Sequence, residues 1–258
     1  MSRHIVLTGG ASGIGAAALA LFKAQGDRVT VIDRHDPGTQ ADAWIAADLS
    51  DIAALPALDP GPEIDGLVNA AGLPPRPGLE ATILRVNTQA VIAVTERLLP
   101  RLRPGGAIVN MASKAGGKWR QNLAQVKRFL ALDPQDDLAA FIHDERIDPV
   151  RAYDLSKEAV IVWGLSNLAR FRERELRINS VSPAAVATPI LDDFMTAFGE
   201  RASKGVEITG RAGRPEEIAQ VIRFLASPEA SWLTGCNIEC DGGLTAQLEF
   251  AALTATES

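Results

Sequence analysis

The stretch Thr8-Gly9-Gly10-Ala11-Ser12-Gly13-Ile14-Gly15 follows directly on the apolar run Ile5-Val6-Leu7. The apolar run predicts a buried strand, and the glycines predict a tight turn into an alanine-rich helix over about residues 14–25. A turn without β-carbons lets a pyrophosphate approach backbone N–H groups at the start of a helix, where the dipole favours negative charge. Tight turns select glycine for other reasons too, so this loop alone is a candidate dinucleotide-binding site and no more.

An acidic residue ends the next apolar run, residues 28–33. Asp33 lies 18 positions after Gly15, where a carboxylate can accept hydrogen bonds from both hydroxyls of an adenosine ribose. That carboxylate would repel a 2′-phosphate, whereas the neighbouring Arg34 could stack on adenine or partner a phosphate. We therefore expect NAD rather than NADP. Asp48, at the end of a third apolar run, could accept from the adenine amino group or cap a helix, and both interpretations stay open.

Apolar runs alternate with helical patterns along the whole chain. This alternation predicts right-handed crossovers and an α/β fold of Rossmann type, a doubly wound parallel sheet in a single domain over residues 1–258. Ligands bind such sheets outside the carboxyl ends of the strands. The expected strands are 5–7, 28–33, 45–48, 64–69, a strand beginning at 106–110, 177–181 and 236–240, and the expected helices after the first are 79–102, 149–172 and 215–226.

Composition excludes several classes of function. The net charge of −6 and the scattered lysines and arginines argue against a nucleic-acid partner. No apolar stretch approaches the roughly 20 residues of a membrane span, and the first strand begins too early for a signal peptide, so we expect a cytoplasmic protein. Cys236 and Cys240 would lie about 13 Å apart on one strand, too far for a disulfide. Three scattered histidines predict no metal site.

Tyr153, the only tyrosine, is followed four residues later by Lys157 within a predicted helix. Residues at this spacing share a helix face, and a nearby positive charge favours the phenolate form of tyrosine. This is how a protein prepares a general acid/base for alcohol and carbonyl chemistry. Taken alone, the pair fits a packed tyrosine beside a solvated lysine better, so the catalytic interpretation depends on the other motifs.

Several motifs together resemble the short-chain dehydrogenase/reductase family. They are the glycine loop, Asn69-Ala70-Ala71-Gly72 after the fourth strand, Asn87, Asn110-Met111-Ala112-Ser113, and the Tyr153/Lys157 pair, in the order that the family has them. The resemblance covers about residues 4–245 and extends to Pro183 through Pro189 and to Asp241-Gly242-Gly243. One departure is Ala184, which stands after Pro183 where the family usually has glycine.

The resemblance implies a catalytic tetrad of Asn87, Ser113, Tyr153 and Lys157. Tyr153 would exchange a proton with the substrate oxygen while hydride passes between substrate and nicotinamide. Lys157 would lower the phenol pKa and bind the nicotinamide ribose, and Ser113 would hold the substrate oxygen. Asn87 would position a water that links Lys157 to solvent through an irregularity in its helix.

The resemblance also implies a set of cofactor-binding residues. Small side chains at Asn69 through Gly72 would let the backbone pass close to NAD, and Thr188 and Val186 would contact its amide or pyrophosphate. The full expected set is Gly9, Ser12, Gly13, Ile14, Gly15, Asp33, Asp48, Leu49, Asn69, Ala70, Ala71, Gly72, Tyr153, Lys157, Pro183, Val186 and Thr188.

Ser113 and Tyr153 are 40 positions apart, further than in the family's common pattern, so an insertion occupies about residues 115–148. Two apolar stripes, 123–130 and 138–142, separated by Asp133-Pro134, predict a helix-turn-helix. The insertion resembles that of a bacterial subgroup of coniferyl-alcohol and 3-alpha-hydroxysteroid dehydrogenases/carbonyl reductases. We expect it to cover the outer face of the Tyr153 helix and to alter a homodimeric or homotetrameric assembly.

A predicted lid follows the Pro183–Pro189 segment, with an apolar stripe at Ile190, Leu191, Phe194, Met195 and Phe198. Residues 73–75 and Trp119 could add apolar walls to the substrate site. Arg76 and Arg120 leave open the possibility that an arginine binds a carboxylate of the substrate. We expect an NAD-dependent dehydrogenase of a hydrophobic aromatic, allylic or alicyclic alcohol. A hydroxysteroid dehydrogenase or general carbonyl reductase is the alternative. A non-catalytic NAD-sensing regulator is a third possibility, against which the intact tetrad argues.

Overall fold

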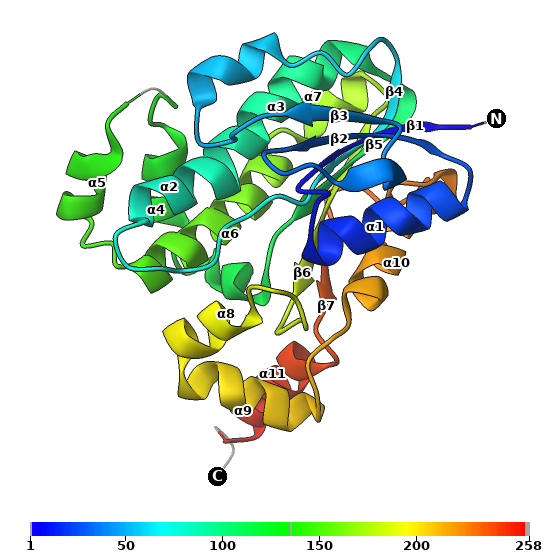
Figure 1. The fold of residues 1–258 in the computed structure, drawn as a ribbon. Coiled ribbons are helices and arrows are strands. Elements are labelled where there is room, and N and C mark those ends of the chain that lie inside the picture. The colour runs from blue at the N-terminus through cyan, green and yellow to red at the C-terminus, as the bar shows by residue number, and fades with distance from the viewer. Residues whose placement is uncertain (1, 135, 256–258) are drawn as a thin grey trace.

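Seven parallel strands form one sheet in the computed structural model, which describes residues 2–134 and 136–255 (Figure 1). The strand order β3-β2-β1-β4-β5-β6-β7 reverses direction between β1 and β4, which confirms the doubly wound fold. The third strand begins two residues before its predicted start, and the fifth begins four residues before its own. The strands are β1 (His4–Thr8), β2 (Arg28–Asp33), β3 (Ala43–Ala46), β4 (Ile64–Asn69), β5 (Leu102–Met111), β6 (Arg177–Pro183) and β7 (Asn237–Cys240).

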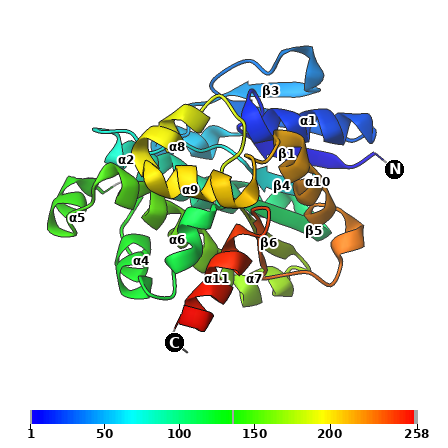
Figure 2. The same cartoon turned by 90° about the horizontal axis from the view of Figure 1, so that it is seen from below.

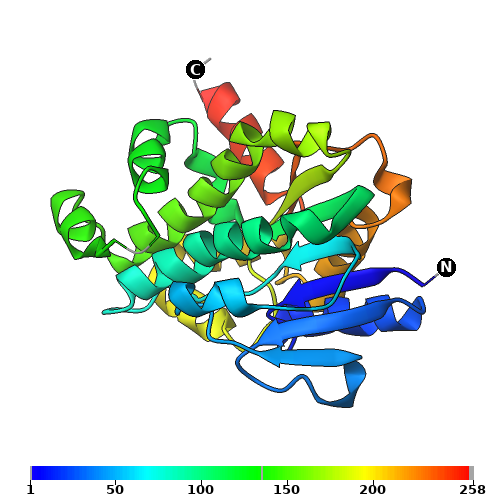
Figure 3. The same cartoon turned by 90° about the horizontal axis from the view of Figure 1, so that it is seen from above.

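Neighbouring residues of the central strands point into two different cores. In β1, Ile5 and Leu7 belong to the core beneath α1 (Gly13–Ala24) and α10 (Pro215–Leu225), whereas Val6 belongs to the opposite core. The opposite core lies under α3 (Ala90–Leu98), α6 (Pro149–Ser166) and α7 (Leu168–Glu173), which cover the other face (Figure 3). Burial on both faces explains why these strands are continuously apolar rather than alternating.

The helix expected over 79–102 is interrupted. It consists of α2 (Glu80–Leu84), a π-helical turn η3 (Arg85–Gln89), α3 and the short η4 (Leu99–Arg101). Asn87 lies in the π-helical turn, so the irregularity predicted at this residue is present. The helix expected over 149–172 is likewise divided, because α6 ends at Ser166 and α7 begins at Leu168.

The insertion forms two helices, as the apolar stripes predict. After the short η5 (Lys114–Lys118) come α4 (Leu123–Leu130) and α5 (Leu138–Asp144), and only residue 135 of the insertion lies outside the described part of the chain. Helix α4 packs on α6 and α5 contacts α2. Phe129 of α4 is 2% exposed and stacks on Phe141 of α5 with 5.8 Å between ring centroids. The insertion therefore covers the outer face of α6.

A buried carboxylate ties the insertion to α6. The Glu158 side chain is fully buried; it accepts a hydrogen bond from Asn122 Nδ2 at 2.6 Å and from Arg151 Nη2 at 2.5 Å. Arg151 also donates from Nε to Gln125 Oε1 in α4, at 2.8 Å. A buried carboxylate is tolerated only when it is paired and hydrogen-bonded, so these partners fix α4 against the helix that carries Tyr153.

Three helices gather below the carboxyl ends of the central strands (Figure 2). They are α8 (Leu191–Phe198), α9 (Glu200–Thr209) and α11 (Leu244–Ala255). The remaining short helical turns are η1 (Gly38–Gln40), η2 (Ile52–Ala57) and η6 (Pro228–Ala230). Within the described residues no helix could span a membrane, no group of side chains could hold a metal ion, and Cys236 and Cys240 are free.

The packing of the insertion predicts unequal effects for two phenylalanine-to-alanine substitutions. Phe129→Ala leaves a cavity between α4, α5 and α6 and should lower the free energy of unfolding by about 3–5 kcal/mol. Phe250→Ala, at a side chain that is 69% exposed in α11, should change it by less than about 0.5 kcal/mol. Urea denaturation of both variants measures the difference. Equal effects would mean that α4 does not pack on the domain in solution.

Candidate active site

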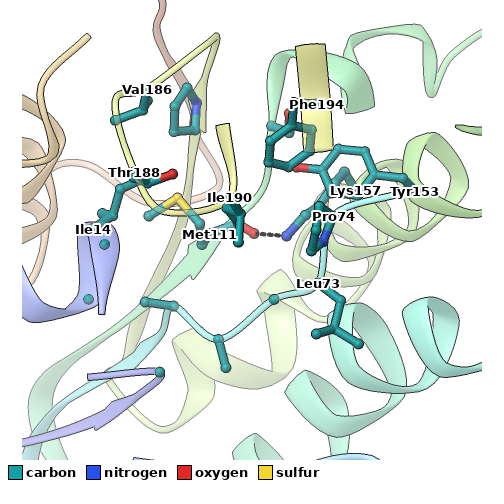
Figure 4. Close-up of a pocket in the computed structure, with 18 of the residues that line it drawn as sticks. Ile14, Leu73, Pro74, Met111, Tyr153, Lys157, Val186, Thr188, Ile190 and Phe194 are labelled. Atoms are coloured by element: carbon teal, nitrogen blue, oxygen red, sulfur yellow. Dashed lines mark hydrogen bonds between the residues drawn. The ribbon is translucent and has the colours of Figure 1, made fainter. Parts of the chain in front are cut away.

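A cavity of about 470 Å³ opens at the carboxyl ends of the strands where the strand order reverses. Its walls come from the loops that follow β1 through β6, from α6, α8 and α9, from the first residue of α11, and from single residues of α2 and η3. This is the place at which a doubly wound sheet binds its ligands. Figure 4 shows the central part of the cavity, with Tyr153 and Lys157 on one side and Ile14 and Thr188 on the other.

The glycine turn is packed too closely for any side chain. Gly9 has a φ of +76°, and a β-carbon on it would lie 2.6 Å from the backbone nitrogen of Ala71. A β-carbon on Gly15 would overlap the carbonyl oxygen of Gly9. Ser12, the N-cap residue of α1, makes no side-chain capping bond, and the first turn of α1 carries no acidic side chain. The helix start is therefore open to an anionic group, as a pyrophosphate requires.

Two carboxylates line the adenosine end that the sequence predicts. Asp33, at the end of β2, accepts a hydrogen bond from Ala11 N at 3.0 Å and one from His35 N at 2.9 Å. Asp48 accepts from both the backbone nitrogen and the hydroxyl of Ser50, each at 2.8 Å, and these bonds hold its pKa below the usual range. Asp51, not Asp48, caps the following helical turn. Of the two open interpretations of Asp48, the helix cap is therefore wrong.

Two of the predicted residues lie beneath the cavity rather than in its wall. Asn69 is 1% exposed and donates from Nδ2 to Asn110 Oδ1 at 2.9 Å, so its side chain joins β4 to β5. Asn87 is fully buried: its Oδ1 accepts from Leu73 N at 2.7 Å and its Nδ2 donates to Leu73 O at 3.0 Å. A β-carbon on Gly72 would lie 3.3 Å from Asn87 Oδ1 and 3.4 Å from Lys157 Nζ, so both groups meet at this glycine.

Tyr153, Lys157 and Ser113 come together at the inner end of the cavity. Lys157 Nζ donates to the carbonyl oxygen of Met111 at 2.9 Å and lies 5.7 Å from the centroid of the Tyr153 ring (Figure 4). Ser113 caps the turn η5 by accepting from Ala115 N at 3.2 Å. The sheet end, the turn and one face of α6 thus hold a phenol, a hydroxyl and an ammonium in one place.

Burial has the largest effect on the pKa values of both Tyr153 and Lys157. Desolvation raises the pKa of Tyr153, and a hydrogen bond with Ser113 opposes this rise only in part. Desolvation also lowers the pKa of Lys157 to about 8. In the protein without cofactor, burial therefore outweighs any lowering of the phenol pKa by Lys157, and Phe194 and Phe198 cover the phenol ring at centroid distances of 5.0 and 6.0 Å.

The outer wall of the cavity is apolar and comes mainly from the predicted lid. Of the lid stripe, Ile190, Phe194 and Phe198 line the cavity, whereas Leu191 and Met195 do not. Leu73 and Pro74 line the opposite wall. An apolar wall around one phenol and one hydroxyl suits a small uncharged organic molecule.

The insertion does not reach this wall. Trp119 and Arg120 stack on each other, with 4.2 Å between the guanidinium carbon and the ring centroid, and they line a separate hollow of about 260 Å³ beside β6 and β7. The expectation that Trp119 adds an apolar wall or that Arg120 faces the substrate is wrong. Of the described residues of the insertion, 115–134 and 136–148, only Ala115 lines the cavity of about 470 Å³.

Of the expected catalytic and cofactor-binding residues, all except Asn69 and Asn87 line the cavity. The cavity also has lining residues that the motifs do not predict: Lys114, Arg201, Ala202, Gly205, Thr209 and Leu244. For Leu244 a signal exists, because it directly follows Asp241-Gly242-Gly243. Helix α9 carries no comparable signal, since its pattern is that of an ordinary amphipathic helix.

Known proteins resemble the chain along nearly all of its length. The family model for short chain dehydrogenase matches residues 3–125, and the model for enoyl-(acyl carrier protein) reductase matches residues 138–245. Coniferyl-alcohol dehydrogenase of Pseudomonas sp. (strain HR199 / DSM 7063) is 35% identical over 94% of this chain and 96% of that protein. The chain belongs to the short-chain dehydrogenase/reductase family.

Two further relatives of this short-chain dehydrogenase/reductase are named as hydroxysteroid dehydrogenases. The 3-alpha-hydroxysteroid dehydrogenase/carbonyl reductase of Comamonas testosteroni is 31% identical over 94% of this chain and 96% of that protein. The crystal structure of the 3-alpha-hydroxysteroid dehydrogenase from Pseudomonas sp. B-0831 complexed with NADH has a TM-score of 0.79 at 32% identity. It covers 95% of this chain and 98% of its own.

Family membership makes the protein an oxidoreductase that uses a nicotinamide cofactor. The described residues fit such a cofactor: the glycine turn accepts a close backbone approach, the start of α1 is free to bind an anion, and Asp33 ends β2 within the same cavity.

The burial of Lys157 predicts a gain in stability on its removal. With a pKa of about 8 against a usual 10.5, Lys157→Met should raise the free energy of unfolding near pH 7 by up to about 3 kcal/mol. Between about pH 8 and 10.5 the unfolded chain binds more protons than the folded one. The wild type therefore gains stability as the pH rises, and the difference between the two proteins should shrink.

Urea denaturation at several pH values measures this difference. Lys118→Met, at an exposed lysine of η5, controls for the loss of a lysine side chain. A Lys157→Met variant whose stability relative to wild type is independent of pH would contradict the pKa assigned to the buried ammonium.

Proposed function

We propose that this protein is an NAD(H)-dependent alcohol dehydrogenase that interconverts a hydrophobic alcohol and its carbonyl compound. The observation that carries the proposal is that the Tyr153 phenol, the Ser113 hydroxyl and the buried Lys157 line the same cavity as the glycine turn. A dinucleotide-binding module has no need for a phenol and a hydroxyl at the apolar end of its cavity.

The bound nicotinamide supplies or accepts the hydride. Tyr153 carries the matching proton to or from the substrate oxygen, and Ser113 donates a hydrogen bond to that oxygen as its charge develops. In the direction of carbonyl reduction, the raised pKa of Tyr153 keeps the phenol protonated and ready to donate. In the direction of alcohol oxidation, the charges of Lys157 and of the oxidised cofactor favour phenolate.

NAD is the proposed form of the cofactor. The Asp33 carboxylate lines the cavity at the end of β2, where it would bind the ribose hydroxyls and repel a 2′-phosphate. The NADH complex of the Pseudomonas sp. B-0831 relative supports the same choice.

The proposed substrate class is an aromatic, allylic or alicyclic alcohol. Phe194 and Phe198 lie edge-on to the Tyr153 ring and would face a flat apolar substrate, with Leu73 and Pro74 opposite. The 35% identity to a coniferyl-alcohol dehydrogenase supports an aryl allylic alcohol. A hydroxysteroid or other carbonyl substrate is the second candidate, favoured by the two hydroxysteroid dehydrogenase relatives.

A screen of alcohols with both cofactors tests the cofactor and the substrate class. We expect NADH formation from coniferyl-type or other aryl alcohols with NAD, and at least about tenfold lower kcat/KM with NADP because Asp33 repels the 2′-phosphate. Absorbance of the reduced cofactor gives the rates. Turnover of 3-hydroxysteroids alone would favour the second candidate, and inactivity on all aryl and alicyclic alcohols would contradict the proposed class.

The role of Tyr153 is tested by its phenylalanine variant. Tyr153→Phe keeps the ring in its contacts with Phe194 and Phe198 and removes only the hydroxyl, so kcat should fall by at least about 100-fold. Calorimetry should find unchanged NAD binding, because Asp33 and the glycine turn remain intact. Phe250→Ala serves as an active control. A Tyr153→Phe variant as fast as wild type would favour a different acid/base, and a wild type that binds NAD without turnover would favour a sensor.

A further inference from the structure

A guanidinium group lines the apolar cavity and is bound by a carboxylate of α8. Arg76 lies in the loop after β4, just beyond the lining residues Leu73 and Pro74. Its Nε donates to Asp193 Oδ1 at 2.9 Å and its Nη2 donates to Asp193 Oδ2 at 2.7 Å. These two parallel bonds join segments 117 residues apart and use the edge of the guanidinium that recognises carboxylates.

Asp193 belongs to the lid and lies outside the cavity that Arg76 lines. It stands in the first turn of α8, next to Phe194, which packs against Tyr153. Figure 4 shows Pro74 and Phe194, the near neighbours of the two charged residues in the chain, close to the Tyr153 ring. The hydrogen bonds from Arg76 hold the pKa of Asp193 below its usual range, so the carboxylate is ionised and neutralises the guanidinium.

The other basic side chains near this end of the cavity also have acidic neighbours. Arg201 lies over the Phe198 ring at 4.8 Å and is paired with Asp154 at 3.2 Å. Lys114 donates to Thr245 Oγ1 at 2.9 Å, and that hydroxyl donates to Asp241 at 2.6 Å. Arg76 and Arg201 thus each have a carboxylate in contact, and Lys114 reaches one through the Thr245 hydroxyl.

We propose that the Arg76–Asp193 pair determines the charge of the substrate that the site accepts. With Asp193 present, the guanidinium is occupied and the cavity takes an uncharged alcohol or carbonyl compound. Without the Asp193 charge, Arg76 becomes an anchor for a substrate carboxylate. Asp193 is then a specificity-determining residue that acts through Arg76. This inference rests on the proposed alcohol dehydrogenase function and extends it to the charge of the substrate.

A pair of alcohols of matched shape tests the inference. One is 4-methylbenzyl alcohol and the other is 4-(hydroxymethyl)benzoate, which places a carboxylate where the first has a methyl group. Wild type should prefer the neutral alcohol. Asp193→Asn keeps the shape of the side chain and removes its charge, so the ratio of kcat/KM for the carboxylate over the neutral alcohol should rise about fivefold, the scale of a partly exposed ion pair.

Two further variants separate substrate charge from lid mechanics. Arg76→Gln combined with Asp193→Asn should abolish the gain, because the anchor is gone. Glu96→Gln breaks the bidentate Arg170–Glu96 pair between α3 and α7, remote from the cavity, and should leave the ratio unchanged. An unchanged ratio in Asp193→Asn, or an equal loss for both alcohols, would overturn the inference and leave the pair as a purely mechanical contact of the lid.

A binding measurement keeps this result separate from the proposed function. Benzoate and benzamide, of nearly equal shape, are titrated into the protein with NADH by calorimetry. Asp193→Asn should strengthen benzoate binding relative to benzamide by the same factor. If wild type oxidises neither alcohol but this shift appears, the proposed function fails and the inference about Asp193 stands. If both alcohols turn over and no shift appears, the inference about Asp193 fails alone.

Discussion

The hydrogen bond from the Lys157 ammonium to the Met111 carbonyl joins the helix that carries the acid/base candidate to the end of the central strand β5. Lys157 is only 3% exposed, and this burial lowers the pKa of its ammonium group to about 8. The ammonium stays buried because the contacts of its helix hold that helix in place. The π-helical turn, the sheet and the inserted α4 all pack on α6. The geometry of Tyr153 therefore depends on contacts made on every side of one helix.

The sequence could predict the parts of this protein that strands and tight turns impose locally. Apolar runs of strand length located all seven strands to within a few residues, and glycines that admit no β-carbon marked the turn at Gly9 and Gly15. It could not predict that Asn69 faces inward, because a polar residue at a strand end can bond either to a ligand or to the neighbouring strand. Nor could spacing reveal Arg201, whose place in the cavity depends on how α9 folds back beneath the sheet.

The insertion and the lid have different roles in the structure. Helices α4 and α5 stabilise α6 from outside through Phe129 and the buried Glu158, yet the inserted residues after Ala115 contribute nothing to the cavity wall in the described chain. The wall that a substrate would meet comes from α8 and the loop after β4. Differences in substrate preference between this protein and its relatives should therefore be sought in those segments, and differences in assembly on the face that α4 covers.

Tyr153 is the only tyrosine among 258 residues, and it lies at the centre of the site in contact with two lid phenylalanines. Because the wild-type protein has a single tyrosine, a spectroscopic label on tyrosine reports on this one site. Biosynthetic incorporation of fluorotyrosine would place one fluorine nucleus, and one resonance, at the phenol ring without any substitution. Because Phe194 and Phe198 contact that ring edge-on, the ring-current shift of the resonance would depend on the distance between these two lid residues and Tyr153.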